Sequence, residues 1–166
     1  EISKKIVVTN TECRPDLHGR TIAQSLKQKG ICVHHFLDSQ VLDAVAKSDV
    51  IFAETRSVVA NGVIADSLLA LIAIAAKEHN VPLYIVSESK NKERASTSSL
   101  NQRLLTLTLS GKRTQKSQEV TRMQKWTTAS SISPSISSSM HVLPANLITG
   151  IISENGIHSH EAFWRT

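Results

Sequence analysis

Short apolar runs alternate with amphipathic stretches along the first half of the chain. Runs rich in β-branched residues, such as Ile6-Val7-Val8, predict buried strands, whereas apolar positions at helical spacing predict helices. The predicted strands are residues 6–9, 31–37, 49–53 and 81–86, and the predicted helices are residues 20–29, 39–47 and 65–79. Because the strands are continuously apolar and helices separate them, the fold class is α/β. We expect a Rossmann-like open, mostly parallel sheet with helices on both faces.

The alternation of apolar runs and amphipathic stretches stops at residue 87, and Ser, Thr, Lys, Gln and Arg prevail up to about residue 140. Such a segment buries too little apolar area to offset an ordering cost of about 1 to 2 kcal/mol per residue. We therefore expect a long disordered Ser/Lys-rich insertion over about residues 88–140, with residues 104–109 as its one strand candidate. Its many hydroxyl groups beside Lys and Arg also make it a candidate for phosphorylation.

Regular secondary structure is expected to resume at Pro144. Apolar side chains at i, i+1, i+4 and i+5 predict a terminal amphipathic helix that Gly156 would end, and they are Leu147, Ile148, Ile151 and Ile152. Phe163 and Trp164 would pack against the protein or contact a partner just beyond it.

Length, charge and hydropathy narrow the class of protein. The 166 residues suffice for one domain with a hydrophobic core, and no apolar run is long enough to span a membrane. Nine Lys and Arg between residues 90 and 125 outweigh Glu93 and Glu119 to give a net charge of +7, although the whole chain carries only +5. The basic character therefore belongs to one segment, and we do not expect a nucleic-acid-binding surface on the folded part.

Polar residues follow the predicted strands where a parallel sheet places its ligand loops. The candidate pocket residues are Glu12, Arg14, His18, Asp38, Glu54, Arg56, Asn61 and Asp66. The first loop lacks the G-x-G-x-x-G pattern, so we expect no dinucleotide, and indeed no cofactor. The histidines and the two cysteines lack metal-ligand spacing, so we expect no metal. Cys13 reads more simply as a small buried thiol than as a nucleophile.

Seven stretches, in order, resemble the C-terminal domain of one known family. They are residues 11–19 (TECRPDLHG), 37–39 (LDS), 49–51 (DVI), 58–62 (VVANG), 76–82 (AKEHNVP), 86–89 (VSES) and 145–149 (ANLIT). The family comprises the alpha, beta and delta subunits of eukaryotic translation initiation factor 2B together with sugar-phosphate isomerases such as methylthioribose-1-phosphate isomerase. The alpha subunit is the most similar member. The resemblance implies a single Rossmann-like domain over residues 1–166, with the helical N-terminal domain of the family absent.

The chain departs from the isomerase pattern where the chemistry would take place. Isomerases of the family carry a catalytic Asp in a G-A-D motif, and counting back from Asn61-Gly62 that Asp falls on Arg56. An Asn-Lys pair that binds the sugar phosphate is replaced by Asp66-Ser67, and a Gln of the first loop by His18. Arginine cannot serve as a general acid or base near neutral pH, and Asp66 would repel a phosphate. The resemblance thus implies an inherited ligand-loop scaffold without catalytic residues.

The function that the resemblance implies is a non-catalytic regulatory subunit of the exchange factor that reloads initiation factor 2 with GTP. It implies a cytoplasmic protein that dimerises, assembles with sister subunits and senses the phosphorylated alpha subunit of factor 2. The alternatives are a sugar-phosphate isomerase or metabolite binder of the methylthioribose-1-phosphate or ribose-1,5-bisphosphate type, a nucleic-acid-binding module that uses the basic segment, and a different subunit of the same family.

Overall fold

The computed structural model describes residues 6–14, 17–55, 57–92 and 140–165. The strands are β1 Val7–Thr11, β2 Cys32–Phe36, β3 Ile51–Glu54, β4 Val58–Val59, β5 Gly62–Asp66, β6 Leu83–Val86, β7 Met140–Pro144, β8 Gly150–Ser153 and β9 Gly156–His158. The helices are α1 His18–Gln28, α2 Val41–Ala46, α3 Ser67–Glu78 and α6 His160–Arg165, with short 3-10 turns η1 Asp38–Gln40, η2 Ser89–Asn91 and η3 Ala145–Leu147. The expected loop and the strand candidate at 104–109 fall almost wholly outside these residues.

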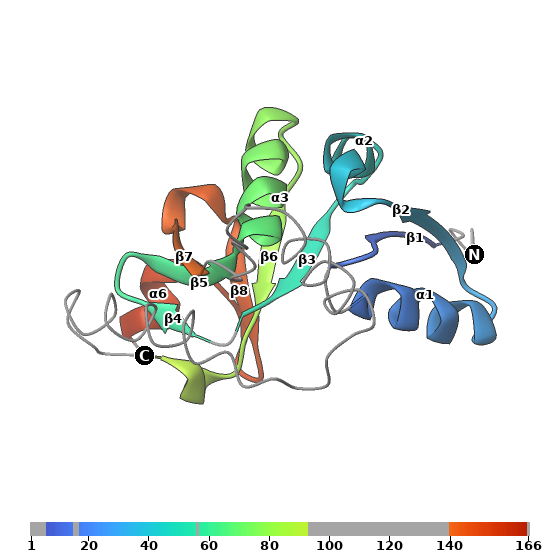
Figure 1. Cartoon of the computed structure of the whole chain (residues 1–166). Coiled ribbons are helices and arrows are strands. Elements are labelled where there is room, and N and C mark those ends of the chain that lie inside the picture. Colours follow the sequence, from blue (N-terminus) through green and yellow to red (C-terminus); the bar gives the residue numbers. More distant parts are fainter. Residues whose placement is uncertain (1–5, 15–16, 56, 93–139, 166) are drawn as a thin grey trace, which may run out of the picture.

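Three of the six strand pairings among the described residues are parallel, and helices connect β1 to β2 and β3 to β6, which confirms the predicted α/β class. β1 pairs with β2, and β3, β6 and β8 follow one another in parallel, with β9 antiparallel at the edge. In Figure 1, α1 lies below β1 and β2 while α2 and α3 stand above the strands. The β1-β2 pair forms one sheet and β3, β6, β8 and β9 form another, and a third, antiparallel sheet of β4, β5 and β7 was not predicted.

The hydrophobic core gathers under α3. Leu69, Ala73 and Ala76 of this helix pack with Leu83 and Ile85 of β6, all of them buried. Helix α3 is apolar nearly all round but not buried all round, because Leu71 and Ile74 are 54% and 59% exposed. The helix also begins at Ser67 and not at residue 65, because the two preceding residues complete β5.

The expected terminal amphipathic helix is wrong. Ile151 and Ile152 lie in β8, where they pair with Ile85 and Val86 of β6, and a tight turn returns the chain as β9. The β-branched pair and the Asn155-Gly156 turn are strand signals that the helical spacing obscured. Phe163 follows in α6 and is only 1% exposed, so it packs within the core.

Among the described residues, no helix is both long and apolar enough to cross a membrane.

Candidate functional site

A buried carboxylate organises the loop that follows β1. Glu12 has a side chain that is only 3% exposed, and its Oε1 accepts a hydrogen bond from Arg14 Nε at 2.7 Å. Its Oε2 accepts one from Arg20 Nη2 of α1 at 2.9 Å. The Arg14 hydrogen bond, with that of Arg20, outweighs burial and lowers the pKa of Glu12. Glu12 is therefore ionised at neutral pH and joins the loop to the helix.

A second carboxylate holds the same loop from the end of β2. Asp38 accepts hydrogen bonds from the backbone N–H of Cys13 at 2.9 Å and from that of Arg14 at 2.7 Å. Cys13 has a φ of 55°, so these two bonds fix a left-handed turn. Asp38 thus has a clear structural role where a nucleotide-binding fold would use it for a ribose.

The environment of the Cys13 thiol does not favour its reaction as a nucleophile. Burial is the largest effect on its pKa, which is raised, and the negative charges of Asp38 and Asp66 raise it further. A reactive cysteine needs the opposite environment, one that stabilises the thiolate. Cys13 is only half-buried, so the expectation of a buried thiol holds in part, while its raised pKa argues against a nucleophile.

Glycine is required where α1 meets β1. A Cβ built on Gly19 would lie 1.7 Å from the carbonyl oxygen of Thr11. The Gly19 N–H donates to the carbonyl of Glu12 at 3.2 Å, and the Leu17 N–H donates to that of Cys13 at 2.8 Å. The Glu12 carbonyl thus occupies the N–H of Gly19 in the first turn of the helix, one of the groups that bind anions in other proteins of this fold class.

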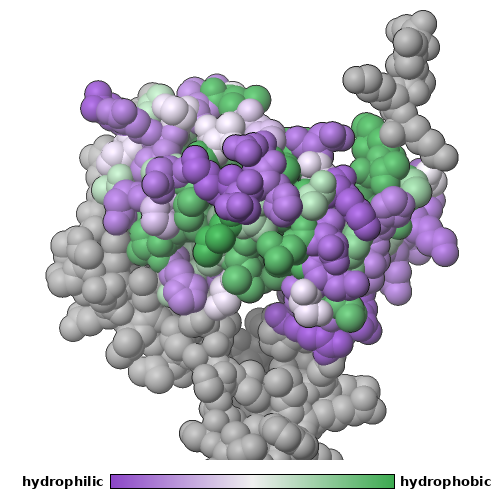
Figure 2. Space-filling view, turned by 90° about the horizontal axis from the view of Figure 1, so that it is seen from above, coloured by the Kyte–Doolittle hydropathy of each residue, from purple (hydrophilic) through white to green (hydrophobic). Residues whose placement is uncertain are grey.

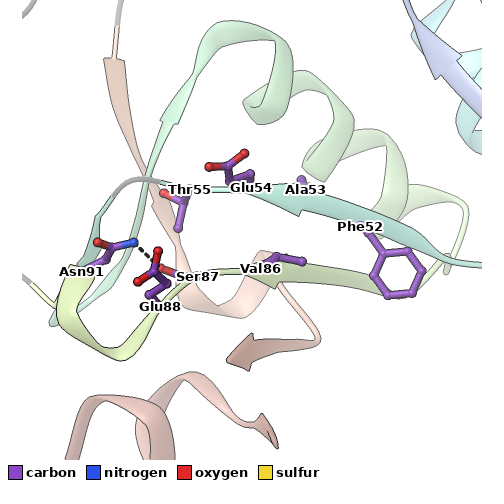
Figure 3. Close-up of a pocket in the computed structure, with 8 residues that line it drawn as sticks. All are labelled: Phe52, Ala53, Glu54, Thr55, Val86, Ser87, Glu88 and Asn91. Carbon is purple, nitrogen blue, oxygen red and sulfur yellow. Dashed lines mark hydrogen bonds between the residues drawn. The ribbon is translucent and has the colours of Figure 1, made fainter. Parts of the chain in front are cut away.

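A shallow hollow of about 390 Å³ lies between the ends of β3 and β6. Its polar lining comes from Glu54, Thr55, Ser87, Glu88 and Asn91. Figure 3 shows the Asn91 amide directed at the Ser87 hydroxyl, whereas the Glu54 carboxylate points away from both. Thr55 is turned inward and donates to the carbonyl of Ile64 at 2.7 Å.

The other predicted residues are not part of one pocket. Asn61 lies exposed in the turn between β4 and β5, and His18 is exposed at the start of α1. Asp66 caps α3 by accepting from the Leu69 N–H at 2.8 Å. Arg56 lies outside the described residues, so its place at the mouth of the sheet stays a prediction.

The structure thus brings Glu12, Arg14 and Asp38 together, with Asp66 close enough to act on Cys13, and places Glu54 in a separate hollow. The sequence reasoning missed Arg20, whose distance from Glu12 in sequence hides their ion pair, and Ser87, Glu88 and Asn91, because it treated the chain after β6 as loop. Among the described residues there is no group of three or more His, Cys, Asp or Glu that could hold a metal ion.

Replacing Glu12 by Gln tests the buried ion pair. We expect a loss of about 2 kcal/mol at neutral pH, limited because the two arginines are half exposed and can turn to solvent. The folded pKa of Glu12 is lowered, so its stabilisation is complete above the unfolded value of about 4.3 and is lost as the pH falls through the folded value. Unfolding free energies of both proteins, measured from neutral to acid pH, should converge in acid. A gap that stays constant would show that the carboxylate charge is not responsible.

Comparisons with known proteins agree with the fold. The model of the Initiation factor 2 subunit family matches residues 1–160. The chain is 33% identical over 161 residues to methylthioribose-1-phosphate isomerase 2 of Pseudothermotoga lettingae, covering 95% of this chain and 44% of that protein. It is 34% identical over 90 residues to the ribose 1,5-bisphosphate isomerase of Thermococcus kodakarensis, covering 54% of this chain and 28% of that protein.

Among solved structures, the subunit delta of translation initiation factor eIF-2B from A. fulgidus superposes with a TM-score of 0.70 at 19% identity, over 92% of this chain and 43% of that one. At that identity the likeness shows the fold alone. The chain spans less than half the length of each of these three proteins.

Proposed function

Since the chain belongs to the Initiation factor 2 subunit family, we propose that it acts as a non-catalytic regulatory subunit of the exchange factor for translation initiation factor 2. The single observation that carries the proposal is the state of the first loop. Its buried carboxylate is paired with two arginines, which lowers the pKa of Glu12, and burial raises the pKa of the Cys13 thiol, so neither group is suited to proton transfer near neutral pH. Isomerisation of a sugar needs such an exchange.

The proposed partners are sister subunits, the phosphorylated alpha subunit of factor 2 and a second copy of the chain, in the cytoplasm. Membership of the Initiation factor 2 subunit family supports this assembly. Apolar side chains also remain exposed on the helices above the sheet, among them Leu42 of α2 and Leu71 and Ile74 of α3. Figure 2 looks onto the molecule from this side and shows hydrophobic surface between hydrophilic residues. Such a surface suits a protein interface.

A sugar-phosphate isomerase is the second candidate, favoured by the 33% identity to an isomerase over 95% of the chain. Its relative is named for methylthioribose-1-phosphate, and binding of such a metabolite without turnover is a weaker form of the same candidate. Arg56, in place of the catalytic Asp of the isomerases, argues against turnover.

Turnover separates the two candidates. We expect the protein that carries this chain to form no ketose product from methylthioribose 1-phosphate or ribose 1,5-bisphosphate above the uncatalysed rate, whereas enzymes accelerate reactions by roughly 10⁶-fold or more. Product would be followed by chromatography, with a catalytically competent isomerase of the family as the positive control. Measurable turnover would overturn the regulatory proposal.

Recovery of partners tests the proposal directly. The tagged protein, purified from its own cells, should bring down sister subunits and factor 2, with factor 2 enriched when its alpha subunit is phosphorylated. As a control, a tagged subunit of the same assembly is purified under conditions in which it keeps its partners. If this protein comes down alone under those conditions, the proposal is contradicted.

A further inference from the structure

The chain contains two Asn-Gly steps, Asn61-Gly62 and Asn155-Gly156, and each lies in a tight turn between two strands. In such a step the backbone nitrogen of Gly can attack the side-chain carbonyl carbon of Asn. An N–C bond forms, the bond from that carbon to the amide nitrogen breaks, and ammonia leaves. Water then opens the resulting succinimide to aspartate or isoaspartate. Gly favours the attack because it has no side chain to shield its nitrogen and leaves the backbone free to turn.

The fold restrains the Asn61-Gly62 pair. Gly62 is buried, and a Cβ built on it would lie 1.9 Å from the carbonyl oxygen of Leu143. The Asn61 carbonyl accepts from the Ala145 N–H at 3.1 Å, and the Gly62 carbonyl accepts from His160 Nε2 at 3.1 Å. The rotation that the attack requires would strain the hydrogen bonds of the Asn61 and Gly62 carbonyls.

The fold leaves Asn155-Gly156 exposed, holds Asn155, among the described residues, only by hydrogen bonds to side chains, and adds a proton donor. Asn155 and Gly156 are both exposed, and Gly156 has a φ of 111° with nothing closer than 4.0 Å to a built Cβ. His158 Nε2 lies 3.2 Å from the carbonyl oxygen of Asn155. A carbonyl only accepts, so the imidazole donates, and this draws electron density from the peptide group and makes the Gly156 N–H more acidic.

The Asn155 side chain holds part of the hollow described above. Its Nδ2 donates to Ser89 Oγ at 3.1 Å, and the neighbouring Glu154 carboxylate accepts from the Ser89 N–H at 3.1 Å. Ser89 begins η2, which ends at Asn91 in the wall of the hollow. Conversion of Asn155 to a carboxylate would replace that donor with a negative charge next to Glu154, so the turn would hold η2 less firmly.

We infer that Asn155-Gly156 is a site of spontaneous deamidation and that its modification loosens η2 at the wall of the hollow. The inference holds whichever of the two candidate functions is correct. Asn61-Gly62 is an internal control of identical local sequence chemistry.

The test compares the two sites in one sample. The protein is incubated at mildly alkaline pH, and peptide mapping resolves asparagine, aspartate and isoaspartate at both positions. In the folded protein we expect conversion at residue 155 to be about tenfold faster than at 61, a difference of about 1.4 kcal/mol in barrier. In denaturant the two rates should agree within about twofold, because the fold no longer distinguishes them. Equal rates in the folded protein, or faster conversion at 61, would overturn the inference.

Two variants separate the parts of the inference. His158→Phe keeps the ring and removes the donor, and should slow conversion at residue 155 by about threefold, half of that barrier difference. Asn155→Asp should speed hydrogen exchange of the amides of residues 89–91, while Asn155→Gln, which keeps the amide, should change it less. An unchanged rate in His158→Phe would remove the imidazole from the mechanism, and unchanged exchange in Asn155→Asp would overturn the link to the hollow.

Discussion

Gly62→Ala is expected to destabilise the fold by about 3 kcal/mol, the upper end of the range for overpacking a well-packed site. The added Cβ would lie 1.9 Å from the carbonyl oxygen of Leu143 and 2.8 Å from its carbonyl carbon. Both are backbone atoms of β7, which pairs with β5 at this point, so relief requires the two strands to separate. The free energy of unfolding, measured by urea titration of both proteins, gives the loss directly.

Gly30→Ala is the matched control. Gly30 has a φ of 76° at the end of α1, but a Cβ built there meets nothing within 4 Å. This substitution isolates the cost of the left-handed backbone, about 1 kcal/mol. A loss at Gly62 no larger than the loss at Gly30 would show that β5 and β7 are not in close contact.

Phe163→Ala is expected to cost about 3 to 5 kcal/mol, the usual price of truncating a buried aromatic side chain. Phe163 is 1% exposed, and the Lys92 ammonium lies 4.6 Å from the centre of its ring. The substitution leaves a cavity and removes the cation–π contact. Thermal and urea unfolding of the variant should both show the loss.

Ile157→Ala is the control for Phe163, because Ile157 is apolar but 67% exposed. Its loss should stay within about 0.5 kcal/mol. If instead Phe163→Ala left stability unchanged and weakened only binding to another protein, Phe163 would be an interface residue, as one of the two readings of the sequence held.

The order of the first elements follows from sequence because each one is set by local pattern. β1, α1, β2, α2 and β3 lie within a few residues of their predicted ranges, since continuous β-branched runs and helical spacing leave little ambiguity there. The segment after Pro144 was wrongly predicted to be a helix, because Ile148, Ile151 and Ile152 satisfy helical spacing by coincidence. Only pairing with β6, a contact across more than sixty residues, decides for strands.

The loops of the candidate site could be located from the sequence, but the hydrogen bonds and ion pairs between its residues could not. The rule that ligand loops follow parallel strands grouped eight residues, of which the structure brings Glu12, Arg14 and Asp38 together. Their partners depend on three-dimensional contacts, such as the Asp38 carboxylate on two backbone N–H groups 24 and 25 residues away. Arg20, which completes the buried ion pair, carries no signal in sequence beyond its charge.

The distribution of buried side chains bears on how the protein is made. Among the described residues, the buried hydrophobic side chains run from Val41 to Phe163, and β1, α1 and β2 contribute none. During synthesis β1, α1 and β2, which bury no hydrophobic side chain, are therefore made before the segments that form the core. Phe163, a core residue, is made after all of them. Leu143, Ile151 and Phe163 complete the core from its C-terminal side, so the nascent chain keeps part of its apolar surface uncovered until α6 has been translated.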